Sequence, residues 1–72
     1  MVSLTEVKKG SLCKVLWMIG QNCSYLKEHF HINEEEDICV INNIGSGLII
    51  SHDGRSIAVS SDVAREIKVA VC

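Results

Sequence analysis

The residues best suited to chemistry lie close together around one short segment of the chain. Cys23, His29 and His31 fall within nine residues of one another, and carboxylates accompany them at Glu28 and from Glu34 to Asp37. Thiolate and imidazole ligands suit zinc and ferrous iron, so this segment is a candidate Fe²⁺ or Zn²⁺ site, although no cofactor is required. His29 and His31 are two residues apart, so on a helix they diverge, and only an extended exit segment would bring both to one side. That geometry favours the alternative of exposed histidines beside an inert thiol.

A Cys–His pair could also form a nucleophile and its base. Such a pair needs the base within hydrogen-bond reach and a third group that orients it. Nothing in the sequence around Cys23 supplies a strained turn or an oxyanion cradle. The sequence therefore indicates a binding protein and not an enzyme.

Three further side chains have predictions of their own. Trp17 is the single tryptophan, and tryptophan often dominates the energetics of an interface, so it could anchor a partner. It shares the parity of Val15 within an apolar run, however, which favours a position in the core. His52, in a predicted hairpin loop, is expected to face solvent, and Cys72 is expected to be a mobile terminal thiol.

Composition excludes several classes of function. The formal charge of −2 and the scattered lysines and arginines argue against nucleic acid as a partner, and they place an RNA-binding barrel third among the candidate functions. The longest apolar runs are far shorter than the roughly 18 residues of a membrane-spanning helix. The N-terminal residues lack the pattern of a secretory signal, so a cytoplasmic protein is expected. Its thiols should then stay reduced, with Cys13 and Cys39 acting as small buried hydrophobes.

Hydrophobic patterning predicts one mainly β domain over residues 1–72. Strands are expected at 11–19, 38–41, 48–51, 56–60 and 67–71. The β-branched and apolar residues of these runs favour strands, and strands this short should curl and close into a barrel of about five strands. A helical turn is expected at 61–66. Asp53-Gly54 between two apolar runs predicts a tight hairpin turn.

A short helix is predicted over Ser24 to Phe30, directly after the first long strand. Asn22 or Ser24 could cap it, because either side chain can accept a hydrogen bond from a first-turn amide. Leu26 and Phe30 are four residues apart and therefore share one face, which would plug one end of the sheet. The run Glu34 to Asp37 reads as a solvated turn, and residues 42–47 read as a glycine-containing loop.

The order of these motifs resembles the FeoA family, the small cytosolic component of bacterial ferrous-iron transport. The resemblance runs from Leu4-x-x-Val7-x-x-Gly10 to the closing pattern Ser56-Ile57-Ala58-Val59 with Ala64, Ile67 and Val69. The chain has His31 where that family usually has glycine, and Glu34-Glu35 where it has a Pro-Gly turn.

This resemblance implies an SH3-like β-barrel that docks on the cytosolic side of the membrane GTPase permease FeoB and modulates transport. It would place the protein in the cytoplasm, peripheral at the inner face of the membrane through its partner. The same domain also occurs at the end of metal-dependent repressors. Residues expected to contact the partner are Leu26, Phe30, Gly45 and Gly47. The alternative is a small metal-binding or metal-delivery protein that uses Cys23, His29 and His31.

Overall fold

The fold is an antiparallel sheet that curls around one apolar core. The computed structural model describes residues 1–71, and Cys72 lies outside them. The elements are β1 (Val2–Ser3), the 3-10 helix η1 (Leu4–Glu6), β2 (Leu12–Met18), α1 (Ser24–Phe30), β3 (Asp37–Asn43), β4 (Gly47–His52), β5 (Arg55–Ser60), α2 (Ser61–Arg65) and β6 (Ile67–Val71). The predicted mainly β architecture is confirmed, including the helix after the first long strand and the helical turn before the last. β1, of only two residues, is the strand beyond the predicted five.

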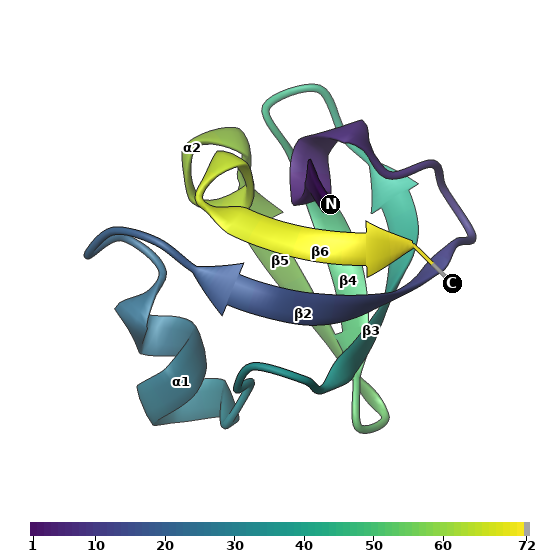
Figure 1. The fold of residues 1–72 in the computed structure, drawn as a ribbon. Coiled ribbons are helices and arrows are strands. Elements are labelled where there is room, and N and C mark those ends of the chain that lie inside the picture. The colour runs from purple at the N-terminus through teal and green to yellow at the C-terminus, as the bar shows by residue number, and fades with distance from the viewer. Residues whose placement is uncertain (72) are drawn as a thin grey trace.

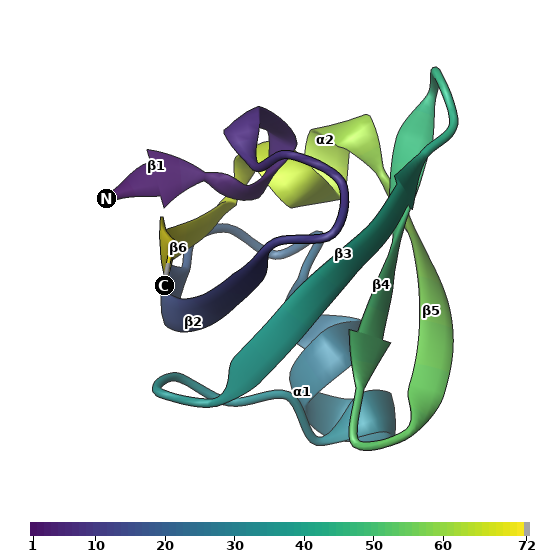
Figure 2. The same ribbon diagram turned by 90° about the vertical axis from the view of Figure 1, so that its right-hand side faces the viewer.

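The sheet curls but does not close, which corrects the prediction of a closed barrel. Its strand order is β1-β6-β2-β3-β4-β5, and within the described chain β1 and β5 are edges that do not pair with each other. Figure 1 shows β6 and β2 in front of β4 and β5, and Figure 2 shows how the sheet bends round between them. Because β1 is too short to bridge the gap, α2 covers the core there by packing against η1, β4 and β5.

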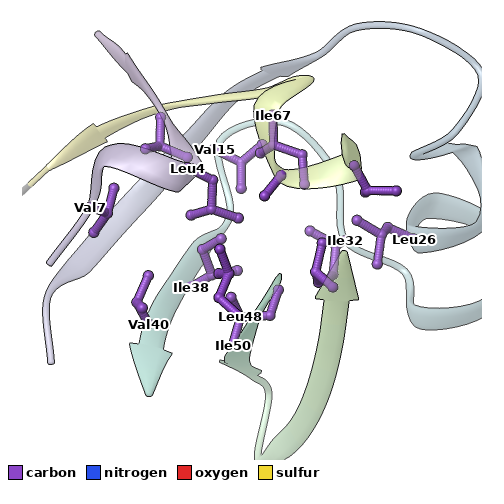
Figure 3. Packing of buried hydrophobic residues seen from close by; sticks show 14 of the residues in the cluster. Leu4, Val7, Val15, Leu26, Ile32, Ile38, Val40, Leu48, Ile50 and Ile67 are labelled. Carbon is purple, nitrogen blue, oxygen red and sulfur yellow. The ribbon is translucent and has the colours of Figure 1, made fainter. Parts of the chain in front are cut away.

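The core consists of side chains that alternate with outward ones along the strands. Val15 of β2, Val40 of β3 and Ile50 of β4 are fully buried (Figure 3). Val69 of β6 is fully buried as well. Leu4 of η1 is also fully buried, so the short N-terminal helix contributes to the same cluster. Burial of such a side chain contributes about 1.5–3 kcal/mol, and these contacts therefore hold the curled sheet together.

The β4–β5 hairpin confirms the Asp53-Gly54 prediction. All six residues of β4 pair with β5, from Gly47 opposite Ser60 to His52 opposite Arg55. The two turn residues have φ values of +52° and +80°, the left-handed conformations that a two-residue hairpin turn needs.

Helix α1 has the predicted bounds, but its predicted caps are wrong. The N-cap residue is Cys23, and its side chain makes no capping hydrogen bond. The Asn22 amide instead donates to the Glu66 carboxylate, and the Ser24 hydroxyl donates to the Gln21 carbonyl. Leu26 is fully buried and Phe30 packs half-buried against the core, so the shared face is confirmed. None of the helices in residues 1–71 is long and apolar enough to cross a membrane.

Candidate functional site

Trp17 is exposed on the outside of the sheet, and the prediction that it belongs to the core is wrong. Cys13 and Val15 point inward and are fully buried, whereas the Trp17 side chain is 42% exposed. The pairing between β2 and β6 shifts register between Val15 and Trp17. This β-bulge inserts one extra residue, Leu16, and so reverses the inward and outward alternation beyond it. Parity in the sequence does not reveal the extra residue, because both faces of this run are apolar.

The outward residues around Trp17 form a surface that we call the Trp17 face. Residues directly opposite each other in an antiparallel pair share a face, and so do residues two apart in one strand. Trp17 lies opposite Lys68, and Lys68 also lies opposite Ser3 of β1. The Trp17 face consists of Ser3, Leu12, Lys14, Trp17, Asp37, Cys39, Lys68 and Ala70. It combines one aromatic ring and one exposed leucine with two lysines and one aspartate.

A second bulge exposes another large apolar side chain. The β3–β4 pairing shifts register between Val40 and Asn42, so Ile41 is the extra residue. Ile41 is 40% exposed, and Leu12, opposite Cys39 on the adjacent strand, is 48% exposed. Bulges often re-aim side chains next to binding sites, and here both of them turn a large apolar group toward solvent.

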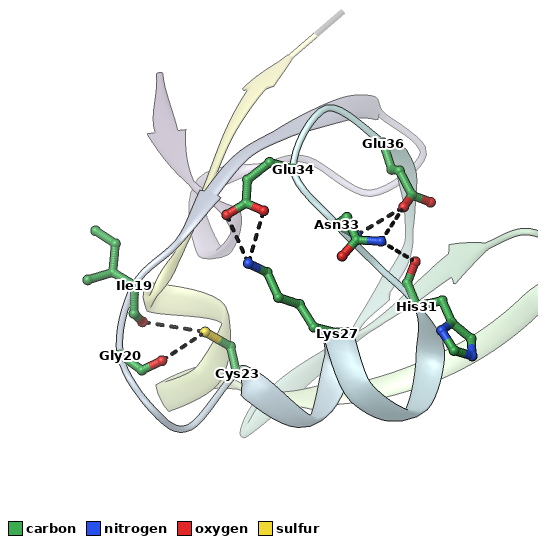
Figure 4. Close-up of polar contacts among 8 residues, drawn as sticks. All are labelled: Ile19, Gly20, Cys23, Lys27, His31, Asn33, Glu34 and Glu36. Atoms are coloured by element: carbon green, nitrogen blue, oxygen red, sulfur yellow. Dashed lines mark hydrogen bonds and ion pairs between the residues drawn. The ribbon is translucent and has the colours of Figure 1, made fainter.

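The three predicted metal ligands are not brought together. Cys23 and His31 cap opposite ends of α1, which places their backbones about 12 Å apart at 1.5 Å per residue (Figure 4). His29 lies exposed on the last turn between them. Among residues 1–71 no group of three or more His, Cys, Asp and Glu side chains could hold a metal ion. Cys23, His29 and His31 therefore do not form one metal site in the structure of residues 1–71.

The Cys23 thiol has the environment of an inert buried group. It is almost fully buried and donates to the carbonyls of Ile19 and Gly20 at 3.4 Å each. Burial, and then the negative charge of Glu66, raise the pKa of the Cys23 thiol. A raised pKa keeps the thiol protonated, whereas both metal ligation and nucleophilic attack require the thiolate.

Two of the neighbouring carboxylates, those of Glu34 and Glu36, interact with other groups of the protein. Glu34 forms an ion pair with Lys27 at 3.0 Å, between the turn and α1. The Glu36 carboxylate accepts hydrogen bonds from the backbone and side-chain amides of Asn33 at 3.0 and 3.1 Å (Figure 4). The run from Glu34 to Asp37 is thus mostly exposed to solvent, as predicted, and is also held by specific contacts. Within it Glu35 has a φ of +73°.

His52 is buried, so the prediction that it faces solvent is wrong. It is the last residue of β4 and follows the inward parity of Leu48 and Ile50, which leaves it 8% exposed. Its Nε2 lies 2.6 Å from Oε1 of Glu36. Because a carboxylate only accepts, His52 donates this bond. The alternation of Leu48 and Ile50 was a local signal for its burial, whereas its partner Glu36 lies sixteen residues earlier in the chain and had no local signal.

The residues predicted to contact a partner divide into exposed and buried ones. Leu26 and Gly47 are buried, so neither can touch a partner directly. A Cβ atom at Gly47 would lie 2.3 Å from the Val59 carbonyl oxygen, which explains the glycine by packing. Phe30 is half-buried against Tyr25, and Gly45 is exposed in the β3–β4 turn with a φ of +71°. The larger exposed surface is the Trp17 face, which sequence parity concealed.

Comparison with known proteins identifies the fold. No protein-family model matches the chain, and no curated protein sequence is similar enough to count as a relative. The structure matches the crystal structure of the iron uptake regulatory protein FeoA with a TM-score of 0.84 at 22% sequence identity, over 99% of this chain and 96% of that one. The chain has the FeoA fold. The resemblance seen in the sequence is thereby confirmed at the level of the fold, and with it the SH3-like architecture.

The FeoA fold also matches parts of two larger proteins. The manganese regulator SloR matches with a TM-score of 0.85 at 19% identity, over 99% of this chain and 34% of that one. ScaR, in a structure with bound Cd²⁺, matches with a TM-score of 0.81 at 18% identity, over 96% and 35% of the two chains. The chain therefore spans about a third of the length of each of these two proteins.

Proposed function

We propose that this chain is an accessory protein of ferrous iron uptake that binds the cytosolic side of the membrane GTPase permease FeoB and modulates transport. The observation that carries this proposal is the match to FeoA over nearly the full length of both chains. In this proposal the protein acts by binding and not by catalysis. It resides in the cytoplasm and reaches the inner face of the membrane only through its partner.

The surface of the domain supports an adaptor. Exposed large apolar side chains mark interaction sites when they gather on one face. Trp17 and Leu12 lie on the outer face of β2, and Ile41 lies on the adjacent strand β3. Tryptophan is the residue type most enriched among interface hot spots, so its exposure favours a protein partner.

A metal-binding or metal-delivery protein is the second candidate. It is favoured by the structural match to ScaR, whose structures contain Cd²⁺ and Zn²⁺. Against it, Cys23 and His31 cap opposite ends of α1, and the Cys23 thiol is buried with a raised pKa. We therefore rank this candidate below the adaptor.

An amide-NMR titration separates the two candidates. The ¹⁵N-labelled protein is titrated anaerobically with the cytosolic GTPase region of its own permease, with and without Fe²⁺. The adaptor proposal predicts shifts confined to one outer face and unchanged by iron. A Cys23→Ser/His31→Gln double variant serves as the control and should bind the permease as the unmodified chain does.

The opposite result of the titration would also distinguish the two candidates. No shifts with the permease, together with broadening around Cys23, His29 and His31 on addition of Fe²⁺ alone, would contradict the adaptor proposal. If the double variant then abolished that broadening, the metal-delivery function would replace it.

A further inference from the structure

The Trp17 face carries positive charge that no carboxylate within residues 1–71 neutralises by an ion pair. The ion pairs in that part of the chain are Lys27 with Glu34, His52 with Glu36 and Arg65 with Asp62. Lys14 is exposed, and the Lys68 ammonium donates only to the Arg65 carbonyl. Asp37 lies on the same face, directly opposite Lys14, but forms no ion pair with it in the described structure. Two lysines without ion pairs, together with one carboxylate, therefore share this face with the exposed indole.

Most of the acidic residues lie in three segments outside the Trp17 face, and one of these, the turn before β3, borders the face, because Glu35 and Glu36 form backbone hydrogen bonds with Val15. Helix α1, the turn before β3 and the β4–β5 turn gather at one end of the fold, at the bottom of Figures 1 and 2. These segments hold five of the nine acidic residues but one of the seven basic ones. Carboxylates of a partner would thus be repelled by the acidic turn and the α1 end and attracted to Lys14 and Lys68, since surface potential steers and orients association.

The spacing of Trp17, Lys14 and Lys68 restricts the kind of ligand that can bind to the Trp17 face. Lys68 lies directly opposite Trp17 on the neighbouring strand, which is about 5 Å away, and Lys14 lies about 10 Å along β2. We propose that the Trp17 face binds an extended acidic segment of a partner protein. In that segment an apolar side chain packs on the indole ring, and carboxylates on either side pair with Lys14 and Lys68.

This inference rests on the proposed function, because it places the acidic segment in the cytosolic part of the permease. A membrane surface fits less well. Electrostatic binding to anionic lipids draws on clusters of about four to eight basic residues, and the Trp17 face has two. Apolar groups between the two lysines, namely Trp17 and Ala70, suit a segment that alternates acidic and apolar side chains.

The test uses the indole of Trp17 as its reporter. The ¹⁵N-labelled chain contains one tryptophan, so a single indole N–H resonance reports on this face even when the permease region contains tryptophans of its own. The region is titrated at low and at high salt, with amide shifts recorded alongside. The indole resonance should move on binding, and the affinity should fall as salt rises because exposed charges are screened.

Charge reversal supplies matched variants. Lys14→Glu/Lys68→Glu reverses both charges on the face, while Lys8→Glu/Lys9→Glu makes the same change in charge in the exposed loop before β2. The inference predicts that the first double variant weakens binding at least about tenfold and the second less than about threefold. Trp17→Ala should weaken binding by at least about tenfold as well.

Each contrary result has its own meaning. Binding that moves other amides but leaves the indole unmoved, and that tolerates Lys14→Glu/Lys68→Glu, would overturn this inference while the proposed function stands. No binding of the permease region at all would overturn the proposed function and this inference with it. An indole shift with phosphatidylglycerol vesicles and none with the permease would overturn the inference in favour of membrane contact.

Discussion

His52 donates a hydrogen bond from Nε2 to the carboxylate of Glu36 across 2.6 Å, and this bond ties the end of the β4–β5 hairpin to the turn before β3. The bond, followed by the hydrogen bond from the Asn33 backbone, lowers the pKa of Glu36 below its ordinary value of 4.5. A carboxylate whose pKa is lower in the folded state contributes stability above the unfolded pKa. That contribution is lost as the pH falls through the folded pKa.

Replacement of Glu36 by glutamine should therefore change the pH dependence of stability. As the pH falls from neutral to below about 4.5, the free energy of unfolding of the wild type should decrease more than that of Glu36→Gln. Urea denaturation at stepped pH measures both, with the exposed Glu28→Gln as control. Parallel pH profiles for wild type and Glu36→Gln would show that the pair does not form in solution.

The bulge in β2 predicts that Trp17 contributes little to stability. Trp17→Ala should lower the free energy of unfolding by no more than about 1 kcal/mol, because the ring is largely outside the core. Ile67→Ala, at a buried position opposite Met18 on β6, should cost about 2–5 kcal/mol. Chemical denaturation compares the two variants. A cost for Trp17→Ala as large as that for Ile67→Ala would place the indole in the core and remove the bulge.

Gly45 of the β3–β4 turn and Gly47, the first residue of β4, should respond differently to alanine. At Gly47 a methyl group would collide with the backbone of Val59, at 2.3 Å from its carbonyl oxygen, so Gly47→Ala should cost about 3 kcal/mol or more. At Gly45 the space is open and only the positive φ opposes alanine, at about 1–2 kcal/mol. Thermal or urea unfolding would reveal the order. Equal costs would contradict the close approach of β4 and β5.

His31 ends helix α1 in the left-handed conformation, with a φ of +58°. Glycine adopts this conformation without strain, so His31→Gly should stabilise the protein by up to about 1 kcal/mol. His29→Gly, inside the last turn of the same helix, should destabilise it by about 1 kcal/mol. Denaturation curves of both variants test the pair. Destabilisation by His31→Gly would mean that the imidazole makes contacts that outweigh its backbone strain.

Much of the fold was predictable because local and global signals agree. The Asp53-Gly54 turn sits between two alternating runs, and its hairpin follows from the backbone preferences of those two residues. The helix over 24–30 follows from the spacing of Leu26 and Phe30, although its predicted caps do not form. The usual glycine of the resembled family at the position of His31 agrees with the left-handed conformation found there.

The features that sequence reasoning missed all depend on contacts between distant segments. The parity of Trp17 could be judged only from the residues of β6 opposite it, because the extra residue of a bulge is defined by the partner strand. The burial of His52 depends on Glu36 arriving from another turn. The sheet can stay open because α2 covers the gap beside η1. The rules of strand pairing do not predict such a contact between a helix and a distant segment.

The most direct test of the account is the initial rate of ferrous iron uptake by cells that carry the permease but lack this chain. The account predicts that the unmodified chain raises the rate, that Lys8→Glu/Lys9→Glu does so equally, and that Lys14→Glu/Lys68→Glu does not, although all three proteins accumulate and fold. An uptake rate that is the same with and without the chain would contradict a role in iron uptake.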